Sequence, residues 1–127
     1  LAPTIGVILP GVTLHLGIPA APGRALIDAG AAVAIGTDCN PGSSPLFSPQ
    51  LAMALAVRLN GLTPAEALVA STANGAAALQ REGVGRLRVG MCADFLVVGS
   101  ADWRDRPDAL GGSPIERMVL AGREFHS

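Results

Sequence analysis

The stretch Ala31-Ala32-Val33-Ala34-Ile35-Gly36-Thr37 decides the fold, because it is continuously apolar and runs directly into a polar loop. A strand that is apolar on both faces is typical of a parallel sheet covered on both sides. Thr4–Leu9 has the same pattern, although periodicity alone also allows a short helix there. A helix is expected over Arg24–Ala29, between Pro22 and Gly30. Strand, helix and strand in this order form a βαβ unit, which predicts an α/β fold.

Two further helices are predicted after this unit. Ser48–Leu59 has a serine cap followed by proline, and Thr63-Pro64-Ala65-Glu66 is a capping box. The second of these helices extends to Ala70 or continues as far as Arg81. Val12–Ala21 contains Gly17 and Pro19 and is followed by Pro22, so we expect a loop there with at most one irregular turn.

The pattern changes after Gly83. Small and large residues alternate over Val84–Gly90, and strands are expected at 93–98, 115–120 and 123–126. These strands indicate a small antiparallel layer. The polar segment Gly99–Pro114 between them is predicted to be a long loop.

The composition excludes several classes of protein. The 127 residues are 50% apolar and carry nine basic and ten acidic residues, which argues against disorder and against a nucleic-acid partner. No apolar run has the length of a membrane span, and Leu1–Pro10 makes a poor signal peptide. Cys39 and Cys92 form no disulfide framework, so we expect a reducing, cytoplasmic compartment. The surplus of apolar residues predicts a surface that a partner covers, in an oligomer or in a larger protein.

Asp38 is the strongest candidate for chemistry. A carboxylate at the end of a doubly buried strand needs a metal, a cation or hydrogen bonds to offset its desolvation. The alternative is an aspartate that only caps the following turn. The loop Asn40-Pro41-Gly42-Ser43-Ser44 offers backbone N–H groups for an anion, or is a plain turn. It is not a Walker loop, because the chain contains no lysine.

The other candidate ligands are weaker. His15 could approach Asp38 across the strand ends, but a single loop histidine is more often solvated, and His126 is expected to have no role. Cys39 is expected to be a packing residue whose side chain points away from Asp38. The sequence has no metal-binding histidine or cysteine pair and no serine–histidine–acid arrangement.

Three segments resemble imidazolonepropionases, which belong to the metal-dependent amidohydrolase superfamily, and a fourth marks only the superfamily. The most specific is T-D-C-N-P-G-S-S-P at 37–45, which follows an apolar strand. V-I-L-P-G at 7–11 is similar to the penultimate strand of their barrel, and L-T-P-A-E-A-L at 62–68 is similar to a helix. The segment 84–98 resembles the return of many amidohydrolases to their β-sandwich.

The resemblance implies the C-terminal part of a (β/α)₈ barrel. Residues 1–83 would hold the last two strands with their helices, and residues 84–127 a few antiparallel strands of the sandwich domain. Such enzymes open 4-imidazolone-5-propanoate to N-formimidoyl-glutamate in histidine degradation, with one zinc or iron ion. By this resemblance Asp38 binds the metal and handles the proton of the attacking water. Asn40 and Gly42 match positions that contact a product-like ligand, and Ser43 matches one that contacts substrate.

The remaining ligands of that family lie upstream of the matched region. One carboxylate cannot hold a catalytic zinc, so we expect this chain alone to bind no ion tightly and to be inactive. The expected partners are a small cyclic amide of the imidazolone type and either a missing N-terminal part or further copies of the chain. Two alternatives stay open: a non-catalytic stand-alone module that dimerises, and one subunit of a split enzyme.

Overall fold

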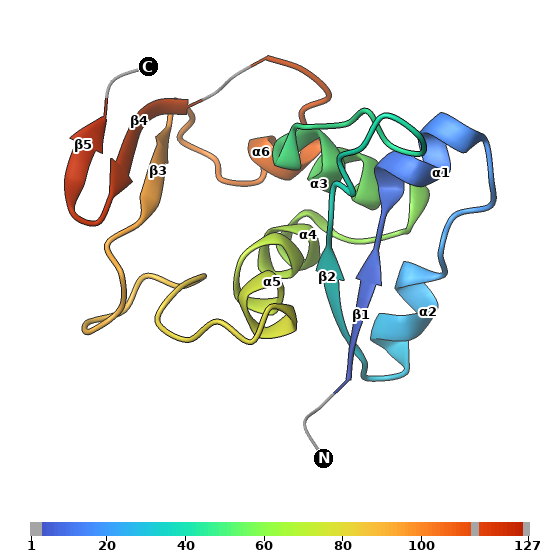
Figure 1. Cartoon of the computed structure of the whole chain (residues 1–127), viewed down its shortest axis with the longest axis horizontal. Coiled ribbons are helices and arrows are strands. Elements are labelled where there is room, and N and C mark those ends of the chain that lie inside the picture. Colours follow the sequence, from blue (N-terminus) through green and yellow to red (C-terminus); the bar gives the residue numbers. More distant parts are fainter. Residues whose placement is uncertain (1–3, 113–114, 126–127) are drawn as a thin grey trace.

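Two separate β-sheets organise the computed structural model, which describes residues 4–112 and 115–125 (Figure 1). In the first sheet, β1 (Ile5–Ile8) and β2 (Ala32–Ile35) pair in parallel, with Ile5 opposite Ala32. The second sheet is antiparallel and has the order β3-β4-β5. Its strands are Phe95–Val98, Ile115–Leu120 and Arg123–Phe125. The predicted α/β class, the βαβ unit and the antiparallel layer are therefore confirmed.

Six helices accompany these strands within the described residues. They are α1 (Pro10–Leu16), α2 (Gly23–Asp28), α3 (Pro49–Leu59), α4 (Pro64–Ser71), α5 (Ala73–Ala78) and α6 (Asp105–Asp108). Helix α2 and the α4–α5 pair lie on opposite sides of the parallel strands in Figure 1, and α1 lies above the end of β1. No helix in residues 4–112 and 115–125 is both long and apolar enough to span a bilayer.

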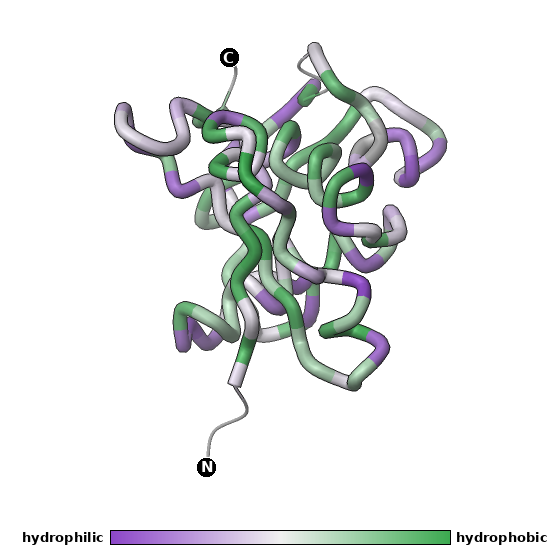
Figure 2. The backbone as a smooth tube through the Cα atoms, turned by 90° about the vertical axis from the view of Figure 1, so that its right-hand side faces the viewer, coloured by the Kyte–Doolittle hydropathy of each residue, from purple (hydrophilic) through white to green (hydrophobic). Residues whose placement is uncertain are grey.

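Small side chains fill the core between the parallel strands and the helices. The buried cluster consists of Ile8, Val33, Ala56, Leu62, Ala67 and Ala70. Alanines on α3 and α4 let these helices approach closely, as expected for a chain with few aromatic residues. Figure 2 shows apolar segments running through the middle of the molecule, while many outer turns are hydrophilic.

Both predicted helix caps are present. Ser48 Oγ accepts a hydrogen bond from the Leu51 N–H at 3.2 Å at the start of α3. At the start of α4, the Thr63 N–H donates to Glu66 Oε2 at 2.7 Å, and the Glu66 N–H donates to Thr63 Oγ1 at 3.3 Å. These reciprocal bonds satisfy two N–H groups that have no partner inside the helix.

A charged link joins α2 to α4. Arg24 Nη1 and Nη2 donate to the two carboxylate oxygens of Glu66 at 2.8 and 3.0 Å, and Arg24 also pairs with Asp28. The hydrogen bonds from the guanidinium hold the pKa of Glu66 at about 2, and they raise the pKa of Arg24 above its ordinary value. This bidentate pair fixes the distance between two helices that are far apart in the sequence.

Several expectations about local structure are wrong. The segment 12–21 contains most of α1, because Pro10 occupies the first helical turn and Gly17, with φ 64°, ends the helix in the left-handed region. For the helix from Thr63, the expected end near Ala70 is confirmed, and only the alternative continuation to Arg81 is wrong. The helix breaks at Thr72 (φ −115°, ψ −87°), where α4 gives way to α5.

The region after α5 also differs in part from expectation. Residues 84–90 form no strand despite their alternation of small and large residues. The expected loop at 99–114 contains the short helix α6, and its last two residues lie outside the described part of the chain, as does His126. Helix α6 packs against α3 and α4.

Large apolar side chains remain exposed on the molecule. Val7 of β1 is 53% exposed and Phe47 is 84% exposed, and Leu14 and Leu96 are more than half exposed. The expectation that both parallel strands are covered on both sides is therefore not met by this chain alone. An exposed apolar surface of this kind is consistent with the prediction that a partner covers part of the chain.

Candidate functional site

The polar loop after β2 is closed by its own backbone. The Asn40 N–H donates to the Ser44 carbonyl oxygen at 2.9 Å, and the Ser44 N–H donates back to the Asn40 carbonyl oxygen at 3.3 Å. The turn at 41–43 therefore projects from a short bridge. Figure 1 places this loop at the carboxyl end of β2, beside α1. Ligand sites of parallel α/β folds gather at this end of the strands.

The side chain of Asn40 organises the loop. Its Oδ1 accepts hydrogen bonds from the N–H groups of Gly42 and Ser43, both at 2.9 Å. Its Nδ2 donates to the Asp38 carbonyl oxygen at 2.6 Å and to Ser43 Oγ at 2.9 Å. Both ends of the amide are therefore used within the loop, which fixes the positions of its neighbours.

The structure brings the predicted site residues together. Asp38 Oδ2 lies 3.2 Å from Asn40 Nδ2 and 3.2 Å from Ser43 Oγ. Gly42 is exposed at the tip of the turn, where a ligand can approach its backbone. The cluster thus brings a carboxylate and a hydroxyl together, with an exposed glycine next to them in the sequence. Their individual roles stay predictions.

Two expectations about burial fail at this site. Asp38 is exposed, so the carboxylate is not desolvated by the chain itself. It has φ 50°, a left-handed conformation that aspartate adopts more easily than most residues. Cys39 is also exposed and does not pack in the core. The left-handed backbone at Asp38 interrupts the alternation of side chains that a continued strand would have. The side chains of Asp38 and Cys39 are therefore exposed and not buried as expected.

His15 lies near the loop without a described bond to Asp38. It lines a shallow cleft of about 350 Å³ with Gly11, Leu14, Pro45 and Leu46, between α1 and the end of the polar loop. The walls are mostly apolar, and His15 supplies the one ionisable side chain among the lining residues. The cleft is adjacent to the candidate site through Pro45, and in the described part of the chain His15 belongs to no group of three or more candidate metal ligands.

The described residues do not fit a complete metal site. Within residues 4–112 and 115–125, no group of three or more histidine, cysteine, aspartate or glutamate side chains is placed to hold an ion. A catalytic zinc usually takes three protein ligands. Asp38 can therefore serve as one ligand of such an ion but does not form a site by itself.

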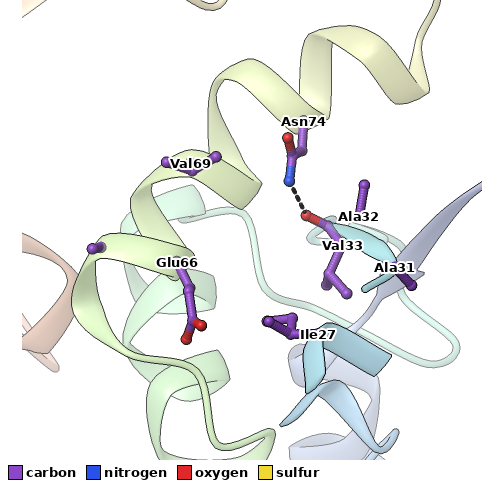
Figure 3. Close-up of a pocket in the computed structure, with 8 residues that line it drawn as sticks. Ile27, Ala31, Ala32, Val33, Glu66, Val69 and Asn74 are labelled. Atoms are coloured by element: carbon purple, nitrogen blue, oxygen red, sulfur yellow. Dashed lines mark hydrogen bonds between the residues drawn. The ribbon is translucent and has the colours of Figure 1, made fainter. Parts of the chain in front are cut away.

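A second pocket is structural in character. It measures about 250 Å³ and lies between α2, β2, α4 and α5 (Figure 3). Its polar side chains are already engaged: Glu66 binds Arg24, and Asn74 Nδ2 donates to the Val33 carbonyl oxygen at 2.8 Å. The remaining lining is apolar, so the pocket offers no group for catalysis.

One residue of the site was not predicted. Ser44 is fully buried, and its Oγ donates to the Thr37 carbonyl oxygen at 2.6 Å. The sequence places two serines side by side at 43 and 44, and nothing in their local pattern tells which of them turns inward. That choice is made by the bridge between Asn40 and Ser44, which the sequence does not reveal.

Comparison with known proteins assigns the family. Residues 14–120 match the model of the amidohydrolase family. The chain belongs to the amidohydrolase family. The predicted resemblance to one group within it is also confirmed, since curated relatives named imidazolonepropionase share 64% identity over 119 residues in Deinococcus deserti and 63% over 122 residues in Deinococcus radiodurans. These matches cover 94% and 96% of this chain but only 30% and 31% of the relatives.

Solved structures of two deaminases have a similar fold over part of their length. Guanine deaminase from E. coli aligns with a TM-score of 0.74 over 94% of this chain and 33% of its own, at 20% identity, which shows a shared fold. An adenosine deaminase from Xanthomonas campestris, solved with bound zinc, gives a TM-score of 0.73 at 26% identity. That alignment covers 94% of this chain and 31% of the deaminase. The chain thus spans about a third of these enzymes.

Proposed function

We propose that this chain is part of an imidazolonepropionase, which opens the ring of 4-imidazolone-5-propanoate to N-formimidoyl-glutamate in histidine degradation. The observation that carries the proposal is the cluster at the carboxyl end of β2, where Asp38 Oδ2 lies 3.2 Å from both Asn40 Nδ2 and Ser43 Oγ. Relatives named imidazolonepropionase, at 43–64% identity, support the choice of substrate.

Each residue of the cluster has a proposed role. Asp38 accepts a proton from the attacking water, because its carboxylate is exposed and already accepts a hydrogen bond from the Ser43 hydroxyl. Ser43 contacts the substrate through its hydroxyl, and Gly42 lets the ligand approach the backbone closely. Asn40 contacts the product-like ligand while its amide holds Asp38 and Ser43 in place.

A zinc or iron ion belongs to the proposal for the whole enzyme, where Asp38 would contribute one carboxylate ligand. Other ligands would come from polypeptide outside this chain, since the described residues hold no group of three or more candidate ligands and a catalytic zinc usually takes three from protein. We therefore propose that the chain alone binds no ion tightly and does not turn over substrate.

Two structural proposals follow from the family. Residues 1–83, with β1, β2 and α1–α5, form the last two units of a (β/α)₈ barrel, and residues 84–127 form part of the sandwich domain. The exposed apolar side chains of Val7, Leu14 and Phe47 favour contact with further polypeptide, either the rest of the enzyme or another copy of the chain. We also propose that the chain works in the cytoplasm, where its two exposed cysteines stay reduced. The near-neutral charge balance supports the absence of a nucleic-acid partner, and we propose no membrane partner either.

A hybrid enzyme tests the proposal. The matching segment of the Deinococcus deserti imidazolonepropionase, 64% identical, is replaced by this chain, and turnover of 4-imidazolone-5-propanoate is measured. We expect an active hybrid and a loss of about 10²–10⁴-fold in kcat for Asp38→Asn, which keeps the left-handed backbone but removes the charge. Asp28→Asn is the matched control on an exposed helix and retains turnover.

Two outcomes would contradict the proposal. A folded, metal-loaded hybrid that does not open the imidazolone ring would show that this chain is not a competent segment of such an enzyme. Full turnover in the Asp38→Asn hybrid would remove the role given to Asp38 and leave the substrate assignment to the relatives alone.

A further inference from the structure

The hydroxyl of Ser44 points into the molecule, unlike that of its neighbour Ser43. Ser44 is fully buried and its Oγ donates to the Thr37 carbonyl oxygen at 2.6 Å. Its main chain pairs with Asn40 across the base of the loop. Ser44 is therefore tied to the end of β2 by its side chain and to the polar loop by its backbone.

The Thr37 carbonyl controls the conformation of Asp38. It belongs to the peptide group that precedes Asp38, and the orientation of that group sets the φ angle of Asp38. With φ 50°, Asp38 is in a region that costs free energy for an L-residue. A short hydrogen bond on the Thr37 carbonyl holds the peptide plane in the orientation that this φ requires. Asn40 Nδ2 holds the carbonyl on the other side of Asp38 at 2.6 Å.

Helix α1 closes over the same hydroxyl at Gly11. A Cβ built on Gly11 would lie 2.5 Å from Ser44 Oγ and 2.8 Å from Leu46 Cδ2. Real Cβ atoms do not make contacts this short, so any side chain at position 11 would displace the hydroxyl or the helix. The absence of a side chain at Gly11 therefore leaves the space that the Ser44 hydroxyl occupies.

We infer that Ser44, whose hydroxyl packs against Gly11, is a positioning residue. It holds the backbone of Asp38 in the conformation that determines where the Asp38 carboxylate points. Ser44 acts through the Thr37–Asp38 peptide and makes no contact with substrate, because it is fully buried. The relevance of this to catalysis rests on the proposed function, whereas the control of Asp38 by Ser44 does not.

The test uses NMR of the 127-residue chain and needs no substrate. A residue with positive φ has a short distance between its amide and α protons, and this gives a strong intraresidue NOE. We expect Ser44→Ala to weaken that NOE of Asp38 by about fourfold. Without the hydrogen bond from Ser44 Oγ to the Thr37 carbonyl, the φ angle of Asp38 returns to the negative region. Ser48→Ala is the matched control, since it removes a serine hydrogen bond four residues away and should leave the NOE unchanged.

A second pair of variants tests the same hydrogen bond of Ser44 by changing glycines in helices α1 and α5. Gly11→Ala should weaken the same NOE by displacing the Ser44 hydroxyl, so it serves if Ser44→Ala does not fold. Gly75→Ala is its control, because a Cβ at that helical glycine meets its nearest described neighbour at an ordinary 3.5 Å. An unchanged Asp38 NOE in folded Ser44→Ala would overturn the inference, as would equal weakening in Ser48→Ala.

The same variants separate the inference from the proposed function. In the hybrid enzyme, Ser44→Ala should lower kcat by about tenfold or more with little change in KM, because the carboxylate is misdirected while the substrate contacts remain. An inactive wild-type hybrid would overturn the proposed function and leave the NMR result standing. A normal kcat together with a lost Asp38 NOE would overturn the link between the Ser44 hydrogen bond and catalysis.

Discussion

Replacing Glu66 with glutamine isolates the charge that links α2 to α4. Glutamine keeps an oxygen for the Thr63 N–H, so the capping box survives, but it loses the ionic partner of Arg24. The fall in the pKa of Glu66 from 4.5 to about 2 corresponds to roughly 3 kcal/mol as an upper limit. Because 29% of the Glu66 side chain and 40% of Arg24 are exposed, solvent screening reduces this, and we expect a loss of about 1–2 kcal/mol near neutral pH.

The pH dependence gives this prediction its sign. The pKa of Glu66 is lower in the folded chain than in the unfolded chain, so its contribution is complete above pH 4.5 and is lost as the pH falls toward 2. The difference in unfolding free energy between the wild type and Glu66→Gln should therefore shrink over this range. Urea unfolding followed by circular dichroism, at several pH values and constant ionic strength, measures it.

Asp28→Asn is the control, because Asp28 also pairs with Arg24 but is 64% exposed. It should cost less than about 0.5 kcal/mol. The reasoning is refuted if Asp28→Asn costs as much as Glu66→Gln, or if the deficit of Glu66→Gln stays constant from neutral pH down to pH 2.

Three further substitutions test the packing. Leu62→Ala removes a core side chain and should lower the unfolding free energy by about 2–5 kcal/mol in the same urea assay. Asn74→Ala leaves the Val33 carbonyl without its side-chain donor and should lower the unfolding free energy by about 1 kcal/mol. Hydrogen exchange should become faster at the start of α5, where Asn74 lies. Phe47→Ser should change the unfolding free energy by less than about 0.5 kcal/mol, since Phe47 is 84% exposed; a larger loss would show that Phe47 packs in this chain.

Local signals explain which parts of the fold could be predicted. The capping residues Ser48 and Thr63 determine helix starts within a single turn, so both helices begin where expected. Helix α1 differs from the predicted loop because Pro10 starts the helix and Gly17 ends it, whereas Gly17 and Pro19 by themselves favour irregular structure. The break at Thr72 depends on how α4 and α5 pack against β2, and no local residue announces it.

The candidate site divides in the same way. The proximity of Asp38, Asn40 and Ser43 was predictable, since they are close in sequence and the loop brings them together, whereas their roles stay predictions. The exposure of Asp38 was not predictable from the apolar strand before it, because burial there depends on surfaces beyond this loop. The inward turn of Ser44 requires the backbone bridge to Asn40, which is a property of the folded loop.

The frame that holds Asp38 does not depend on its negative charge. The Asn40 amide binds the backbone of Asp38 and the Ser44 hydroxyl binds the backbone before it, so asparagine would occupy the position with the loop intact. One nucleotide change converts an aspartate codon to an asparagine codon. In an enzyme where Asp38 has the role proposed above, this single substitution would therefore end turnover while the loop still folds.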